Sequence, residues 1–296
     1  MLKFLRMFVT VVSSIPNIHE VIPAWLSRHQ LMKKTKTQTH TKPIVANATT
    51  AVCLVGAYRT FSLAFVRKNF ESTFRQASFD PYHLFVNIQL EARLKSKLGN
   101  MTKANISGII SDLDDLDRRV FSEYKLKISN ETSGCRMKQS IYSQFSKISD
   151  CYNSMVLRRE YDLGLRYKYV IRTRTDLVYI TPIPFLSTLS SSGGVHVSTY
   201  HRELSDHFWI SPRSISDHVF NMTFWFCEEG KESVKNRTKQ AFGAERLLQD
   251  YWNAQSVNIL KENHIIAVYD HNRKLMCNRL EDWPSAYQKC SEMQPN

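Results

Sequence analysis

The sequence predicts an α/β fold in which helices flank a mostly parallel sheet. Continuous apolar runs such as "AVCLVGAY" (51–58) are typical of strands that are covered on both faces. Stretches with helical spacing of apolar residues, such as 61–76, lie between these runs. This alternation of strands and helices indicates a sheet between helical layers. A hydrophobic fraction of 43% is enough for a sizeable core.

Further elements follow in the same alternation. The segment "DLDDLDRRVFSEYK" favours a helix, because acidic residues are stabilised in the first turn of a helix. Residues 99–111 carry two Asn-X-Ser/Thr sequons and are expected to form an exposed loop. The expected strands are 51–58, 82–88, 167–180, 193–200, 208–212 and 264–270, and the expected helices are 61–76, 112–125, 136–165 and 241–255.

The first 46 residues differ from the rest of the chain in composition. "MLKFLRMFVTVVSSIP" joins two basic residues to a short apolar stretch, which is typical of a signal peptide or a weak signal-anchor; a buried helix is the alternative. Residues 27–43 are polar, basic and rich in Thr, which indicates a stem. We therefore expect a signal/anchor and basic stem at 1–46, which could tether the protein to a membrane, and a single catalytic domain at 47–296.

Sequons and cysteines indicate the secretory pathway, with the Golgi lumen or membrane as the expected place. An even number of cysteines fits disulfides in an oxidising compartment, although Cys53 lies in an apolar run and could be a buried thiol. Their spacing does not suggest a zinc site. The six cysteines are Cys53, Cys135, Cys151, Cys227, Cys277 and Cys290, and the six sequons begin at Asn47, Asn100, Asn105, Asn130, Asn221 and Asn236.

The net charge of +13 suits an anionic ligand or a membrane surface. No basic stripe with interleaved aromatic residues and no DNA-binding motif accompanies it, so nucleic acid is not an expected partner.

Charged residues end the apolar run of "YKYVIRTRTDLVYI" (167–180). Strand alternation would place Arg172, Arg174 and Asp176 on one face. Ligands of open α/β sheets bind outside the carboxyl ends of the strands, and guanidinium groups suit diphosphate oxygens. The run therefore predicts part of an electropositive crevice. The alternative is a structural network in which Asp176 neutralises one arginine.

The first expected strand contributes to the same edge of the sheet. It ends in "LVGAYRTF", where Gly56 permits a tight turn and Arg59 and Thr60 follow. Two strand ends that both deliver arginines would build one pocket, so we expect Arg59 to lie in the same site as Asp176.

Four motifs, "CLVGAYRTF", "YKYVIRTRTDLVY", "SDHFWIS" and "GAERLLQDYW", occur in that order. Together they resemble GT-A-like glycosyltransferases of bacterial surface-polysaccharide loci and of some eukaryotes and viruses, over about residues 51–280. The resemblance implies a nucleotide-diphospho-sugar transferase fold. It also implies transfer of a sugar from a sugar nucleotide to a glycan or glycoconjugate acceptor. On this resemblance the donor-binding residues are Gly56, Arg59, Thr60, Arg172, Arg174 and Asp176.

The sequence departs from this family at the expected metal site. Many such enzymes hold Mn²⁺ or Mg²⁺ with an Asp-x-Asp pair, but the matching position reads Arg174-Thr175-Asp176, with one carboxylate. Asp176 is therefore the candidate ligand of a divalent metal. The alternative is that Arg174 supplies the positive charge in place of the metal.

Two carboxylates are candidates for catalysis. Asp206 precedes an aromatic strand and could accept a hydrogen bond from a sugar hydroxyl, or it could cap a turn. Glu245 shares the apolar face of its expected helix with Ala241, Leu248 and Trp252. Desolvation there would raise its pKa toward that of a general base, unless a buried arginine pairs with it.

Two other functions fit parts of the sequence. "GAYRTFS" is similar to the phosphosulfate-binding loop of Golgi sulfotransferases, but it lacks the glycines and lysine of that loop. The loss of the second metal carboxylate also fits a non-catalytic, carbohydrate-binding relative of the transferases.

Overall fold

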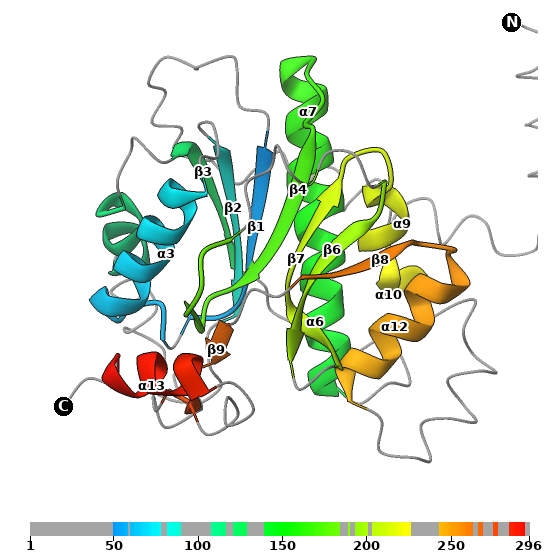
Figure 1. Cartoon of the computed structure of the whole chain (residues 1–296). Coiled ribbons are helices and arrows are strands. Elements are labelled where there is room, and N and C mark those ends of the chain that lie inside the picture. The colour runs from blue at the N-terminus through cyan, green and yellow to red at the C-terminus, as the bar shows by residue number, and fades with distance from the viewer. Residues whose placement is uncertain are drawn as a thin grey trace, which may run out of the picture. The chain divides into compact units, whose positions relative to one another are not determined.

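The computed structural model describes one compact unit, Val45–Asn296 (Figure 1). The signal/anchor and stem expected at 1–46 lie outside the described residues. No helix within the described stretches is long and apolar enough to cross a membrane. The described residues are 50–58, 60–77, 82–89, 108–116, 121–128, 139–183, 189, 193–200, 203–225, 243–262, 266–268, 275–277 and 284–293.

A seven-stranded sheet in the order β3-β2-β1-β4-β7-β6-β8 forms the centre of this unit (Figure 1). Four neighbouring pairs are parallel, and only β7 runs antiparallel to its neighbours β4 and β6. The mostly parallel α/β class expected from the sequence is thus confirmed. The strands are β1 Thr50–Ala57, β2 Tyr82–Gln89, β3 Phe121–Ile128, β4 Tyr169–Arg174, β6 Val195–Tyr200, β7 Glu203–Pro212 and β8 Ile259–Glu262.

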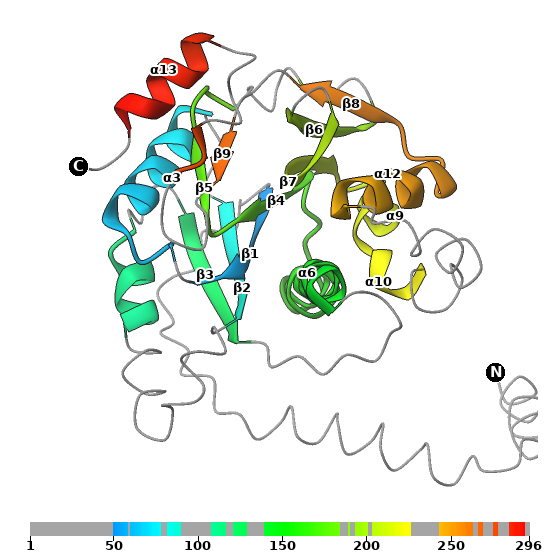
Figure 2. The same cartoon turned by 90° about the horizontal axis from the view of Figure 1, so that it is seen from below.

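Helices cover both faces of the sheet, and the sheet divides the core in two (Figure 2). Strand alternation decides which core each side chain joins: Val52 and Leu54 of β1 pack with α3, whereas Ala51 and Cys53 pack with α6. The first face carries α3 Ala64–Gln76 and α13 Pro284–Glu292. The second carries α6 Gln139–Asp150, the π-helix η1 Cys151–Val156, α7 Leu157–Leu163, α9 Ser216–Phe220, α10 Met222–Phe224 and α12 Ala244–Ala254.

The expected single strand at 167–180 is wrong. β4 ends at Arg174, and the chain turns at Thr175 and Asp176 before β5 Leu177–Tyr179 pairs with β9 Ile266–Val268 in a separate sheet. Val178 consequently joins the α3 core instead of the face of Arg172. The turn is fixed from outside the segment, because the Thr175 hydroxyl donates a hydrogen bond to the carbonyl of Ala57 at 2.6 Å.

The helix expected at 112–125 is also wrong. A helix covers 108–114, and β3 begins at Phe121 and pairs with β2. The alternation of Tyr124, Leu126 and Ile128 is the strand signal that the acidic start of the segment obscured. Residue Ile109, inside the loop expected to be exposed, is buried in the α3 core.

Other boundaries shift less. The long helix expected at 136–165 is α6, η1 and α7 in succession. The strand expected at 208–212 is the end of β7. No expected strand corresponds to β8.

A buried ion pair fixes where α7 ends and β4 begins. Arg213 donates two hydrogen bonds of 2.9 Å to the carboxylate of Glu160, which also accepts one from the backbone N–H of Tyr167. Burial opposes the charge of Arg213, but its contact with Glu160 raises the pKa of the guanidinium overall. The pair therefore anchors the strand that carries Arg172 and Arg174.

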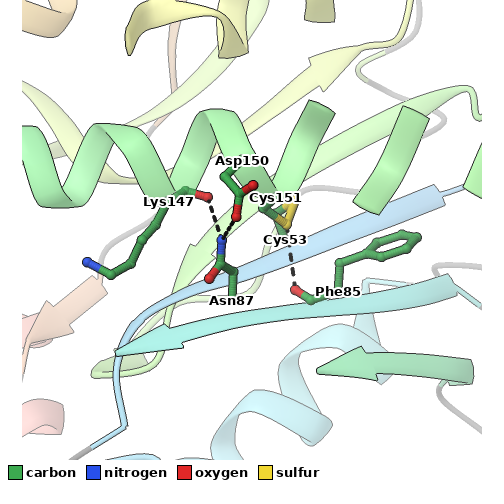
Figure 3. The surroundings of a disulfide bond; sticks show 6 residues. All are labelled: Cys53, Phe85, Asn87, Lys147, Asp150 and Cys151. Carbon is green, nitrogen blue, oxygen red and sulfur yellow. Dashed lines mark hydrogen bonds between the residues drawn. A yellow bond between two sulfur atoms is a disulfide. The ribbon is translucent and has the colours of Figure 1, made fainter. Parts of the chain in front are cut away.

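A disulfide joins the central strand β1 to the helix behind it (Figure 3). Cys53 and Cys151 are bonded, with a Cα–Cα distance of 6.2 Å, so the prediction of a buried thiol at Cys53 is wrong. Beside this disulfide, the Asn87 amide donates to Asp150 at 2.8 Å (Figure 3). A second disulfide joins Cys277 to Cys290. Cys135 and Cys227 lie outside the described residues.

Candidate functional site

The site lies where the order of the parallel strands reverses. From β1 the chain adds β2 and β3 on one side, and it then returns to place β4 on the other side of β1. In open α/β sheets, ligands bind outside the carboxyl ends of strands at such a switch point. β7 is antiparallel to β4, so its early residues reach the same edge. The strand ends expected to form the site are therefore neighbours.

The turn after β1 contacts the turn after β4. Gly56 has a φ of +155°, and a Cβ atom there would lie 2.7 Å from the hydroxyl of Thr175. The Thr60 hydroxyl donates to the carbonyl of Thr175 at 3.3 Å. Gly56 and Thr60 thus position the turn that carries Asp176. Arg59, whose place beside Asp176 was predicted, lies outside the described residues.

Replacing Gly56 by Ala should therefore destabilise the fold and move the Thr175 turn, because the new methyl group would clash with Thr175 Oγ1. We expect a loss of roughly 1–3 kcal/mol in the free energy of unfolding. Urea titration of Gly56→Ala, Thr175→Ala and the double variant measures the coupling. The double variant should lose clearly less than the sum of the single losses, whereas strict additivity would contradict the contact.

Arg174 and Asp176 form a two-pronged ion pair. Arg174 Nε donates to Asp176 Oδ1 at 2.7 Å, and Nη2 donates to Oδ2 at 2.6 Å. Burial opposes the charge of Arg174, but the field of Asp176 raises the pKa of the guanidinium overall. One guanidinium engages both carboxylate oxygens of Asp176, which matches the ion network considered as the alternative for this residue. The role of Asp176 as a metal ligand stays a prediction.

Arg172 is the deepest charge in the site. It is 1% exposed, and its guanidinium lies 4.9 Å from the ring centre of Trp209, with which it is paired across β4 and β7. Its Nε and Nη1 atoms are buried and have no hydrogen-bond partner within the described part of the chain. Burial lowers the pKa of Arg172 to about 9, against the opposing pull of Asp206, so the side chain is a cation at neutral pH.

An irregularity in β7 brings two successive side chains into the site. The ladder of β6 and β7 shifts register between Val197 and Thr199, opposite Leu204 to Trp209. Successive residues of a regular strand point to opposite faces, but a bulge can re-aim one of them. Asp206 and His207 both point toward the α12 side, where their ligand atoms lie within 4.8 Å of a Glu245 oxygen and of each other.

Asp206 is ionised at neutral pH in spite of its burial. Burial raises its pKa, but His207 and the two arginines of β4 outweigh this effect and hold the pKa at about 2. Gln144 of α6 donates its side-chain N–H to Oδ2. Oδ1 lies 3.1 Å from His207 Nε2. That contact lacks hydrogen-bond geometry, and Oδ1 accepts no hydrogen bond from the described residues.

The imidazole of His207 is uncharged at neutral pH, so only one of its two ring nitrogens carries a proton. Burial, together with Arg174 and Arg172, lowers the pKa of its imidazole to about 4 against the opposing effect of Asp206. A neutral imidazole has one nitrogen lone pair available for a hydrogen-bond donor or a metal.

Glu245 completes the site from the first turn of α12, which begins at Ala244. Leu248 and Trp252 are buried one and two turns later, as expected for that face. Glu245 itself is only partly buried, so desolvation supports a general base less strongly than the sequence suggested. Ala241, expected on the same face, lies outside the described residues.

The structure therefore brings together most of the residues that the sequence singled out for this site. Gln144 and the role of His207 were missed, because neither belongs to a pattern that distinguishes it from an ordinary polar residue. Among the described members, three carboxylates (Asp176, Asp206 and Glu245) accompany two guanidinium groups (Arg172 and Arg174).

In comparisons with known proteins, no family model matches the chain, and no curated protein matches it.

Proposed function

We propose that this chain is a glycosyltransferase that moves a sugar from a nucleotide-diphosphate donor to a glycan or glycoconjugate acceptor. The observation that carries the proposal is the convergence of Arg172 and Arg174 with Asp206 and Glu245 at the switch point of the sheet. Cations at this position suit a diphosphate, and carboxylates beside them suit sugar hydroxyls or a metal. The mostly parallel sheet is compatible with a GT-A-like fold, which we propose on the resemblance of the motifs.

In this function Arg174 is the residue that reaches the donor. Its side chain is partly exposed, whereas Arg172 is buried beneath it. A guanidinium has five N–H donors, and Asp176 accepts from two atoms of Arg174, so further donors can face a diphosphate. The reaction breaks the bond between the anomeric carbon and the diphosphate. It forms a bond to the acceptor oxygen, whose proton passes to a base, and the nucleoside diphosphate leaves.

A secretory location forms part of the proposal. Two disulfides among the described residues fit an oxidising compartment, and cytosolic proteins rarely keep such bonds. The Golgi lumen, with an N-terminal tether, is the location that we propose.

Equilibrium binding of UDP, GDP, CDP and adenosine 3′,5′-bisphosphate to the full chain tests this function. We expect at least one nucleoside diphosphate to bind, and Arg174→Ala to weaken it about tenfold to a hundredfold, because one or more charge-assisted hydrogen bonds are lost. Arg174→Lys should recover part of the loss. Arg246→Ala, on the exposed side of α12, is the matched control and should bind as wild type does.

The same measurement separates the alternatives. Binding of the bisphosphate alone would overturn the proposal in favour of a sulfotransferase. Binding of a nucleoside diphosphate without turnover of any corresponding sugar nucleotide, with acceptor or water, would indicate a non-catalytic binding protein.

A further inference from the structure

The bulge of β7 and the start of α12 place three metal-ligating side chains at one point. A carboxylate oxygen of Asp206, a ring nitrogen of His207 and a carboxylate oxygen of Glu245 all lie within 4.8 Å of one another. The first two side chains are buried and the third is partly exposed. Asp206 and His207 lie on β7 and Glu245 lies on α12, so the cluster joins two elements of regular structure.

The distance between Asp206 and His207 matches the separation of two ligands of one ion. Two ligand atoms that each lie about 2.2 Å from a metal, at right angles to each other, are about 3.1 Å apart. Asp206 Oδ1 and His207 Nε2 are separated by 3.1 Å. Oδ1 is buried and accepts no hydrogen bond from the described residues, although a buried carboxylate oxygen normally has a partner.

Neighbouring residues hold this carboxylate in place. The Gln144 amide donates to Asp206 Oδ2 and leaves Oδ1 directed to the cluster. Such outer partners orient metal-ligating carboxylates and are part of the design of metal sites.

We infer that Asp206, His207 and Glu245 bind a divalent transition-metal cation such as Mn²⁺, and that Asp176 does not. Two carboxylates and one imidazole form a mixed oxygen and nitrogen set, which Mg²⁺ prefers less than Mn²⁺ does. Asp176 keeps Arg174 as its partner. Only the role of the ion in catalysis rests on the proposed function. In a glycosyltransferase the ion would lie beside the donor diphosphate, and Asp206 and Glu245 would be its ligands and not proton acceptors.

Titration of the full chain with MnCl₂, without any nucleotide, tests the site. The room-temperature electron paramagnetic resonance signal of free Mn²⁺ measures the bound fraction. We expect one bound ion per chain, and an affinity reduced at least about tenfold in Asp206→Asn and in Glu245→Gln. Asp176→Asn removes the same charge from the same site without removing a ligand, so it should weaken Mn²⁺ binding less than either of these variants does.

Three results would overturn the inference: no bound Mn²⁺ in wild type, unchanged affinity in Glu245→Gln, or loss of binding in Asp176→Asn alone. Glu245 is partly exposed at the start of a helix, so its variant should fold even if Asp206→Asn does not. The absence of nucleotide separates this result from the proposed function. Mn²⁺ bound by a chain that binds no nucleoside diphosphate would leave the metal site standing and refute the glycosyltransferase.

Discussion

Replacing Arg172 by Met should lower the free energy of unfolding by about 1–3 kcal/mol. Met has a similar length and no charge, so the variant removes the guanidinium from beneath the site with little change in volume. Arg172 is one of the cations that keep Asp206 ionised, and both side chains are almost fully buried. Removing a cation whose field offsets the buried charge of Asp206 leaves that carboxylate less compensated, which is destabilising.

Urea unfolding at neutral pH measures this loss, with two companion variants. Arg158→Met is the matched surface control, because Arg158 is exposed and pairs only within its helix, and it should change stability by less than about 1 kcal/mol. Arg172→Met combined with Asp206→Asn should recover much of the loss, because both charges are removed. Wild-type stability in Arg172→Met alone would show that the charge of Asp206 does not depend on Arg172.

Removal of the Cys53–Cys151 disulfide should cost about 4–5 kcal/mol. The bond closes a loop between residues 98 positions apart, and loop-closure entropy predicts a loss of this size for a loop of about 100 residues. The pair Cys53→Ala and Cys151→Ala also leaves space between β1 and η1, which adds to the loss.

The second disulfide provides the comparison. Cys277 and Cys290 are 13 positions apart, so their replacement by Ala should cost about 3 kcal/mol on the same model. Urea unfolding of both double variants, under oxidising conditions that leave the other disulfides intact, ranks the two losses. A larger loss from the short loop would show that packing, and not chain entropy, sets the contribution of each bond.

Local patterns in the sequence were enough to predict the class of the fold. The apolar run at 51–58 is β1, and the run at 82–88 is β2, because a strand covered on both faces leaves a continuous apolar signal. The segment 112–125 misled the prediction, since acidic residues that suit a helix start precede a strand that is defined by its pairing with β2. The strand signal in this segment was weaker than its helix signal, and the pairing with β2 decides between them.

The candidate site was predictable only in part for the same reason. Alternation correctly placed Arg172 near the end of an apolar strand, but it could not predict the turn at Thr175, which is held by Ala57 from β1. The meeting of Asp206 and His207 depends on a bulge that arises from pairing with β6. The helical face of 241–255 was enough to single out Glu245, but only the tertiary structure places it beside Asp206 and His207.

The disulfide behind the central strand also constrains how the chain is made. Cys53 emerges from the ribosome before Cys151 exists, and synthesis of the chain from Cys53 to Cys151, 98 positions later, takes roughly 5–20 s at ordinary translation rates. Both sulfurs are fully buried once the sheet is covered, so an oxidant or an isomerase must act before α6 closes over β1. During that interval the Cys53 thiol is open to wrong partners, including the other cysteines of the chain. A reducing expression host would therefore supply a chain without its central cross-link.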